Sequence, residues 1–182
     1  MIEEFNYIYE NKIWGDDGNR CYSGSSGGGS EIDFNIHDYI PFMQRFIENN
    51  NITSVCDLGC GSGKLIEPIF DIYDNIVYYG YDCYSKIICY NQFRLLHKKK
   101  YNFIYLDIIN NIDEIINCEL YIMKDILQHW KLNLVYYFLD TIISKKKCKY
   151  ILICNCCKNQ AYDRFENIDG ALNARYYPLK NL

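Results

Sequence analysis

The chain has 182 residues, of which 49% are hydrophobic and 23% charged, and its formal net charge is −4 at pH 7. This length and balance suit one globular domain and exclude a disordered or fibrous chain. The acidic net charge disfavours a generic DNA- or RNA-binding protein, because such proteins usually carry a basic excess.

The hydrophobicity pattern of the sequence shows neither a secretory signal nor a membrane-spanning segment. No stretch approaches the roughly 20 apolar residues that a membrane-spanning helix needs. Residues 1–4 (MIEE) do not begin a basic region followed by an apolar core, as a secretory signal would. We therefore expect a cytoplasmic protein, or one in the host cytoplasm if the source is viral, with its ten cysteines reduced.

The first composition shift is a Ser/Gly-rich tract at residues 23–30. A plain linker is one interpretation. A substrate or cofactor loop is the other, because glycines allow close backbone approach to a ligand and serines supply hydroxyls. We interpret residues 1–30 as a lid or substrate segment, in which Trp14 and Ser26 contact the substrate, and residues 31–182 as one globular domain.

The next segments alternate between helical spacing and short apolar runs. A helix is predicted to start at a Ser30 cap and to end at Asn49–Asn51. Further helices are predicted over 64–73 (with Pro68 as a local flaw), 84–98 and 132–144. Strands are predicted over 52–56, 76–81, 103–106, 120–123 and 150–154. Strands that alternate with helices predict an α/β fold with a parallel sheet covered on both faces.

The loop Asp57-Leu58-Gly59-Cys60-Gly61-Ser62-Gly63 joins the first predicted strand to its helix. Ligands bind at this edge of an open parallel sheet. The spacing differs from the G-x-G-x-x-G of dinucleotide loops, and Leu65 stands where a phosphate loop needs Ser or Thr. Asp57 beside the loop suits a ligand with an ammonium group.

Two further acids follow the second and third predicted strands. Asp82 could accept hydrogen bonds from both hydroxyls of a ribose. Asp107 could accept one from an adenine amino group while Ile108 packs on the ring. Asp82 as a helix cap and Asp107 as a loop acid remain the simpler alternatives.

These motifs resemble those of the class I S-adenosylmethionine-dependent methyltransferases, over about residues 52–156. The resemblance implies a Rossmann-like three-layer α/β/α fold, S-adenosylmethionine as cofactor and S-adenosylhomocysteine as product. It implies that Asp57 and the glycine loop hold the methionine end of the cofactor, and that Asp82 holds the ribose. The implied cofactor contacts are Asp57, Gly59, Cys60, Gly61, Gly63, Asp82, Cys83, Asp107, Ile108 and Lys124.

Two other segments resemble one bacterial-type subfamily of unsettled substrate: residues 13–16 with the Ser/Gly tract, and residues 124–130. Members of that subfamily continue after a segment like Tyr177-Pro178-Leu179, whereas this chain stops at Leu182. The sheet is therefore expected to be shortened at its C-terminal edge, or completed by a partner.

The acceptor is expected at the end of the fourth predicted strand. Asp125 and His129 are four residues apart and would share a face if this segment is helical. His129 is the candidate general base, because imidazole titrates near neutral pH. Asp125 could orient this base, hold an acceptor hydroxyl or cap a turn. Gln128, Trp130 and Asn155 are expected to contact the substrate, with Trp130 as a pocket wall.

The cysteines are the remaining candidate ligands. Cys154, Cys156 and Cys157 are close in sequence, but a structural zinc site normally needs two close pairs, and buried thiols explain them better. No metal is therefore expected.

The sequence favours methyl transfer to a small polar acceptor, most simply an oxygen of a sugar or glycan precursor. Alternatives are methylation of a protein or an RNA, and an inactive cofactor-binding subunit that stabilises a partner. A nicotinamide-dependent oxidoreductase is disfavoured by the glycine spacing. A homodimer is possible, and no membrane partner is expected.

Overall fold

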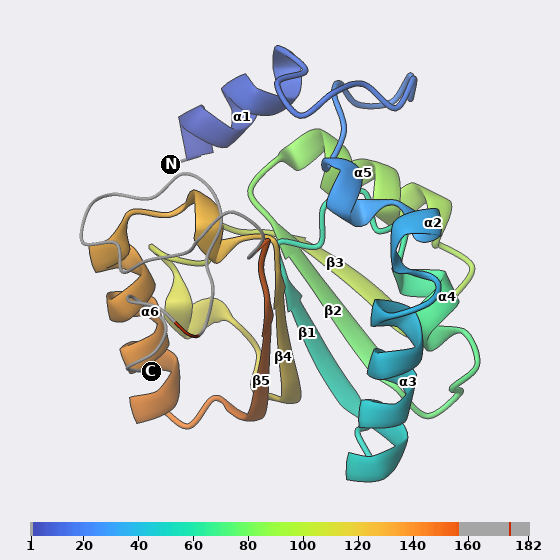
Figure 1. The fold of residues 1–182 in the computed structure, drawn as a ribbon, viewed down its shortest axis with the longest axis vertical. Helices are drawn as coiled ribbons and strands as arrows, with labels where there is room; N and C mark the ends of the chain where they lie inside the picture. The colour runs from blue at the N-terminus through green and yellow to red at the C-terminus, as the bar shows by residue number, and fades with distance from the viewer. Residues whose placement is uncertain (1, 157–174, 176–182) are drawn as a thin grey trace.

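The computed structural model describes residues 2–156 and 175. In this part of the chain, five strands form one parallel sheet in the order β3-β2-β1-β4-β5 (Figure 1). The strands are β1 (Ser54–Leu58), β2 (Val77–Asp82), β3 (Tyr101–Tyr105), β4 (Cys118–Lys124) and β5 (Cys148–Cys154). The α/β fold with a parallel sheet expected from the sequence is confirmed.

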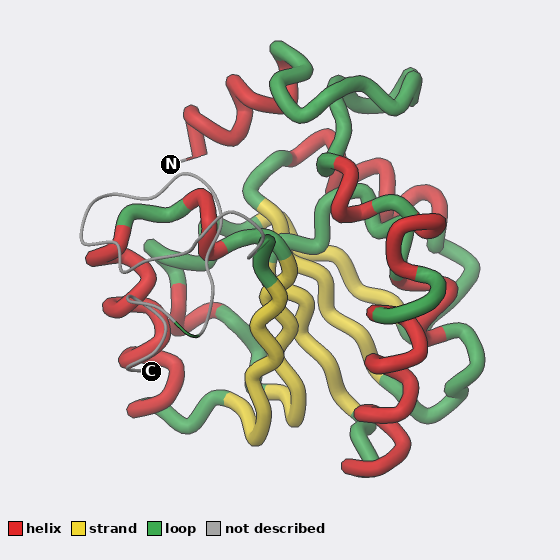
Figure 2. The backbone as a smooth tube through the Cα atoms, in the orientation of Figure 1, coloured by secondary structure: helices red, strands yellow, loops and turns green. Residues whose placement is uncertain are grey.

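Helices cover both faces of the sheet, so the molecule has three layers (Figures 1 and 2). On one side lie α3 (Tyr39–Asn50), α4 (Ile66–Phe70) and α5 (Ser85–Arg94), and on the other lies α6 (Leu132–Ser144). Each face has its own apolar cluster, one around Val55 and Tyr78 and the other around Cys56 and Tyr121. Residues adjacent in a strand point to opposite faces, which is why Val55 and Cys56 belong to different clusters.

The register brings the ends of the central strands to one level. Asp57 of β1 pairs with Gly80 of β2 and with Ile122 of β4, and Asp82 pairs with Tyr105 of β3. Since all strands run in the same direction, the residues that follow β1, β2, β3 and β4 meet at a single edge.

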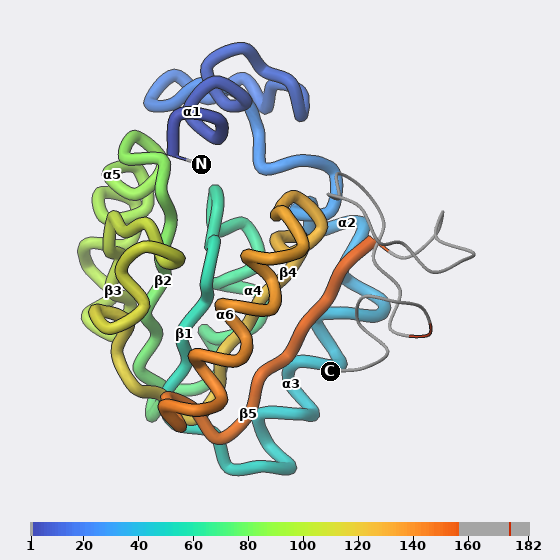
Figure 3. The backbone as a smooth tube through the Cα atoms, turned by 90° about the vertical axis from the view of Figure 1, so that its left-hand side faces the viewer, coloured from blue at the N-terminus to red at the C-terminus, as the bar shows by residue number. Residues whose placement is uncertain are grey.

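The N-terminal segment crosses this edge. The helix α1 (Ile2–Glu10) and the chain up to α2 (Ile32–Asn35) lie over the carboxyl ends of the strands in both views (Figure 3). No helix was predicted for residues 2–10, so α1 is an element that the sequence pattern did not reveal.

The helix expected after Ser30 is split in two. Instead of capping a helix, the Ser30 hydroxyl donates to the Gly27 carbonyl at 2.7 Å. The buried Asn35 side chain donates to the carbonyls of Gly29 and Glu31, and the backbone leaves the helical region at Asp38 before α3 begins. The end of α3 is confirmed, since Asn51 adopts the left-handed conformation with φ 51°.

The helix α4 is shorter than the predicted 64–73, because Lys64 and Leu65 belong to a turn and the helix ends at Phe70. Pro68 falls within its first turn, where a missing N–H is tolerated. None of the helices within the described residues is long and apolar enough to cross a bilayer.

Candidate functional site

A cavity lies at the edge where the strands end, beneath the N-terminal segment. Its walls include every site residue expected from the sequence except Gln128 and Asn155. These wall residues are Trp14, Ser26, Asp57, Gly59, Cys60, Gly61, Gly63, Asp82, Cys83, Asp107, Ile108, Lys124, Asp125, His129 and Trp130.

The glycine loop bends tightly around one end of the cavity. The backbone N–H groups of Gly59 and Cys60 both donate to the Tyr81 carbonyl, at 2.7 and 2.9 Å, which ties the loop to the end of β2. Gly61 has φ 51°, and a Cβ on it would lie 2.5 Å from Ser26 Oγ. A larger residue at this position would be strained and would push the N-terminal segment away.

Asp57 lies at the end of β1, where its carboxylate accepts a hydrogen bond from the Tyr78 hydroxyl at 2.8 Å. Burial raises the pKa of Asp57 to about 6, while the Tyr78 hydrogen bond and the charge of Lys124 act in the opposite direction. A ligand with an ammonium group at this position would hold Asp57 in its ionised form.

Asp82, at the end of β2, connects the glycine loop to the start of α5. Its Oδ2 accepts from the Gly61 N–H at 3.0 Å, and its Oδ1 accepts from the Tyr84 N–H at 2.9 Å, directly before α5. Burial raises the pKa of Asp82, and these backbone hydrogen bonds oppose the rise. Each carboxylate oxygen has further lone-pair capacity, so Asp82 can both hold the loop and accept from a ligand in the cavity.

Asp107 follows β3 and organises its own turn. Its Oδ1 accepts from the backbone N–H groups of Ile109 and Asn110, and its Oδ2 accepts from the Asn110 side chain at 2.7 Å. These hydrogen bonds all lie within the turn, as expected for the simpler alternative, in which Asp107 is a loop acid. Asp107 and Ile108 still line the cavity next to Cys83.

Lys124 connects β4 to the Ser/Gly tract. Its Nζ donates to the Gly29 carbonyl at 2.7 Å and lies 2.6 Å from the Asp125 carboxylate. The tract is therefore folded against the site, which argues against a plain linker.

The segment after β4 is a turn and not the helix considered for Asp125 and His129. Asp125 has φ 56°, and a single 3₁₀ turn follows at Leu127–His129. Asp125 and His129 therefore do not share the face of a helix. Both side chains still line the cavity, because the turn brings them to the same edge.

His129 packs against the N-terminal segment. Its ring centroid lies 4.8 Å from that of Trp14, which itself contacts Phe5 and Tyr9 edge-on. Trp130 is 2% exposed and packs on Phe138, so it belongs to the core as well as to the wall of the cavity.

Gln128 and Asn155 lie outside the walls of the cavity. Gln128 accepts a hydrogen bond from the Cys156 N–H at 2.7 Å. Asn155 Oδ1 is buried and has no hydrogen-bond partner among the described residues. Their contact with a substrate remains a prediction that the described geometry does not support.

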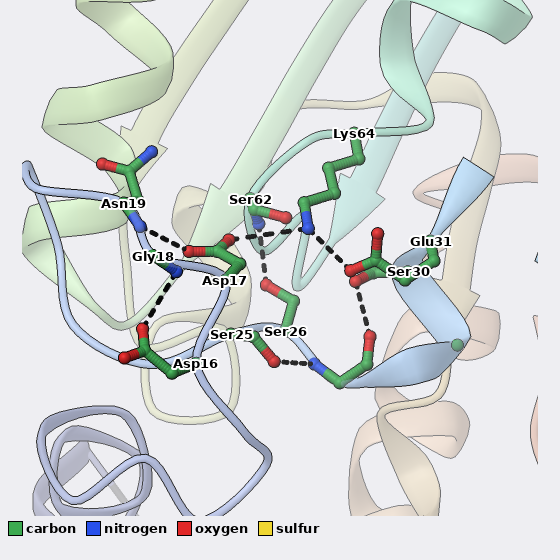
Figure 4. Close-up of polar contacts among 12 residues, drawn as sticks. Asp16, Asp17, Gly18, Asn19, Ser25, Ser26, Ser30, Glu31, Ser62 and Lys64 are labelled. Atoms are coloured by element: carbon green, nitrogen blue, oxygen red, sulfur yellow. Dashed lines mark hydrogen bonds and ion pairs between the residues drawn. The ribbon is translucent and has the colours of Figure 1, made fainter. Parts of the chain in front are cut away.

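The N-terminal segment is fastened to the glycine loop at two points (Figure 4). Ser26 Oγ accepts from the Ser62 N–H at 2.8 Å and lies 3.1 Å from the Tyr9 hydroxyl. Lys64, which follows the loop, pairs with Glu31 at 2.6 Å and with Asp17 at 3.6 Å. These contacts hold the segment over the cavity.

Several residues that line the cavity were not identified from the sequence. Ile2, Phe5 and Tyr9 come from α1, and Tyr39 and Ile126 also line the cavity. The spacing of Ile2, Phe5 and Tyr9 is that of one face of a helix, and this was the signal that could have revealed them.

The described cysteines form no metal site. In residues 2–156 and 175, no three His, Cys, Asp or Glu side chains are grouped as metal ligands. Cys56 and Cys118 are buried with their sulfurs 3.1 Å apart, as small apolar side chains of the core. Cys157 and the segment Tyr177-Pro178-Leu179 lie outside the described residues.

No protein-family model and no curated protein matches the chain. Solved structures do match. The methyltransferase domain of bacterial CtHen1-C has a TM-score of 0.55 at 14% identity, over 63% of this chain and 62% of that one. Human N-acetylserotonin methyltransferase in complex with SAM has a TM-score of 0.54 at 17% identity, over 69% and 36%.

Magnesium protoporphyrin IX methyltransferase from Synechocystis PCC 6803, with bound SAH, has a TM-score of 0.53 at 18% identity, over 65% of this chain and 54% of that one. The chain thus spans less than two thirds of the length of each of these structures. The parallel sheet, the glycine loop after β1 and these likenesses agree: the chain has the Rossmann-like fold of the class I methyltransferases.

Proposed function

We propose that the chain is an S-adenosylmethionine-dependent methyltransferase that acts on a small-molecule acceptor. The observation that carries this proposal is the convergence of the glycine loop and the acids after β1, β2 and β3 on one cavity. Similar structures that contain SAM or SAH support the choice of ligand.

The residues present fit this cofactor. Asp57 would pair with the ammonium of its methionine portion, and the left-handed conformation of Gly61 lets the loop turn tightly beside it. Asp82 would accept from the ribose hydroxyls with the lone pairs that its backbone partners leave unused. Ile108 and Cys83, beside Asp107, would form the adenine end.

The cofactor, when bound, supplies a methyl group on a sulfonium sulfur. The chain would align an acceptor with that methyl group and exclude water from it, which are the main contributions that a protein makes to such a displacement. A ring nitrogen of His129 would take the proton that the acceptor loses. Trp14 would hold the His129 ring in place by packing against it.

An oxygen of a sugar or glycan precursor, favoured by the sequence, is one acceptor that this reaction could use. Methylation of a protein or an RNA would need an open groove, whereas the N-terminal segment lies over the described cavity.

Titration calorimetry with S-adenosylhomocysteine, paired with a mass-spectrometric assay of methyl transfer, tests the proposal. We expect binding with one site per chain and loss of most of the affinity in Asp82→Asn. Absence of binding by the unchanged protein would refute the function. Binding without turnover of any acceptor would instead indicate the inactive cofactor-binding subunit.

A further inference from the structure

The walls of the cavity differ between its two ends. The glycine loop and the acids form one end. The other end lies between α1 and the turn after β4, where the acceptor would meet the methyl group. Since this chain would choose its acceptor by the chemistry of that second end, its side chains indicate the class of acceptor.

The helix α1 turns an apolar face toward the cavity. Ile2, Phe5 and Tyr9 are spaced along one side of the helix and all line the cavity, whereas Tyr7, on the opposite side, is 62% exposed. Phe5 also contacts Trp14 with ring centroids 5.9 Å apart. Tyr9 lies nearer the glycine loop, where its hydroxyl is 3.1 Å from Ser26 Oγ, so Ile2 and Phe5 form the apolar roof of the acceptor end.

The facing wall is mixed, since its apolar side chains stand beside Lys124, Asp125 and His129. Ile126 and Trp130 line it, and the Trp14 ring packs on His129 at its margin. Flat rings pack well between such surfaces, through offset stacking and edge-on contacts. An apolar pocket with a few polar groups is typical of sites for small organic ligands.

Two of the polar side chains at this end, Lys124 and Asp125, already bond to each other. Lys124 also donates to the Gly29 carbonyl. A sugar in this space would bury several hydroxyls with few partners, at a cost of about 1–3 kcal/mol for each unsatisfied group.

We propose that the acceptor is a flat apolar ring that carries a hydroxyl group, a phenol in chemical class, and that the inner face of α1 selects it. This rests on the proposed function and replaces the sugar expected from the sequence. The phenol oxygen forms a C–O bond to the methyl carbon as the C–S bond breaks. The electron pair of the C–S bond stays on sulfur. The phenolic proton goes to His129 and then to water.

Calorimetry in the presence of saturating S-adenosylhomocysteine tests this choice with two probes, 2-naphthol and methyl α-glucoside. We expect 2-naphthol to bind at least about tenfold more tightly, since burial of one aromatic ring is worth roughly that much or more. Equal binding of the two probes, or tighter binding of the glucoside, would overturn the proposal.

A matched pair of variants tests the role of α1. Phe5→Ser should weaken 2-naphthol binding about tenfold, and Tyr7→Ser, the same change on the outer face, should alter it less than about twofold. Circular dichroism and S-adenosylhomocysteine affinity report whether both variants remain folded, and Phe5→Leu, which keeps an apolar side chain, should recover most of the binding.

The proposed function and the phenol proposal can be refuted separately. If S-adenosylhomocysteine does not bind the unchanged protein, the proposed function itself fails. If it binds but Phe5→Ser leaves the affinity for 2-naphthol unchanged, only the phenol proposal fails.

Discussion

At the scale of single residues, Asp57 shows how burial prepares a group for a charged ligand. Its pKa, raised to about 6 by burial, means that its charge state changes just below neutral pH. In the absence of a ligand, the folded protein holds this proton more tightly than the unfolded chain does. Asp57 therefore lowers stability as pH rises from about 4 to about 6, the interval between its unfolded and folded pKa values.

We predict that affinity for S-adenosylhomocysteine rises with pH through this interval, because the ligand ammonium needs the ionised carboxylate. Calorimetry should show binding about tenfold weaker at pH 5 than at pH 7.5. Asp57→Asn should remove this dependence, and Tyr78→Phe should move the midpoint upward, since it deletes the hydrogen bond that stabilises the charge. Affinity that stays constant across this range would contradict the role of Asp57.

A second prediction concerns His129 as general base. His129→Ala should lower turnover about 100-fold or more, the usual effect of losing a positioned base, with the S-adenosylhomocysteine affinity within about twofold. His37→Ala, at an exposed position away from the cavity, is the control and should retain full turnover. A fully active His129→Ala enzyme would show that the acceptor loses its proton elsewhere.

At the scale of elements, the position of the N-terminal segment depends on contacts between parts of the chain that are distant in sequence. Glu31 is partly exposed and pairs with Lys64 across the glycine loop. Exposed ion pairs contribute only about 0.2–1 kcal/mol, so we expect this contact to affect how readily the N-terminal segment leaves the cavity, without deciding whether the protein folds.

We therefore expect Glu31→Gln to speed dissociation of S-adenosylhomocysteine about two- to fivefold, as measured by stopped-flow fluorescence. Asp113→Asn, which removes a comparable exposed pair with Lys145 outside the walls of the cavity, should leave the rate unchanged. The same rate in both variants would mean that the N-terminal segment is held by its other contacts.

The elements also show what the sequence could and could not reveal. Strand identity and the bounds of α6 were predictable, because apolar runs and helical spacing are local signals. The break between α2 and α3 was not, since it depends on Asn35 bonding to Gly29 and Glu31. The contacts of Ser26 and Lys124 were likewise beyond prediction, because they join the Ser/Gly tract to the ends of β1 and β4.

The candidate cofactor site was more predictable than the acceptor site. The positions of Asp57, Asp82 and Asp107 followed from the rule that parallel strands present their carboxyl ends at one edge. The acceptor end depends on α1, which lies over this edge only through tertiary packing. Its apolar face is visible in the spacing of residues 2–9, but nothing local indicates what that face covers.

At the scale of the whole molecule, ligand binding should stabilise the fold by mass action. At 100 times its Kd, S-adenosylhomocysteine should add about 2.7 kcal/mol. For a domain of this size that corresponds to a Tm increase of roughly 5–11 °C. Differential scanning fluorimetry should show this increase, and NADH should give none. A shift with NADH would revive the oxidoreductase interpretation.

One carboxylate bonds to both the glycine loop and the start of α5, since Asp82 accepts from the N–H groups of Gly61 and Tyr84. These two amide protons are 23 positions apart in the chain, yet neither can be exposed to solvent fully without disturbing the same acceptor. In hydrogen–deuterium exchange, both protons should exchange through one shared opening event and show similar protection. A ligand in the cavity should slow the exchange of both. The exchange rate of the Tyr84 amide, directly before α5, would then indicate whether a ligand occupies the glycine loop.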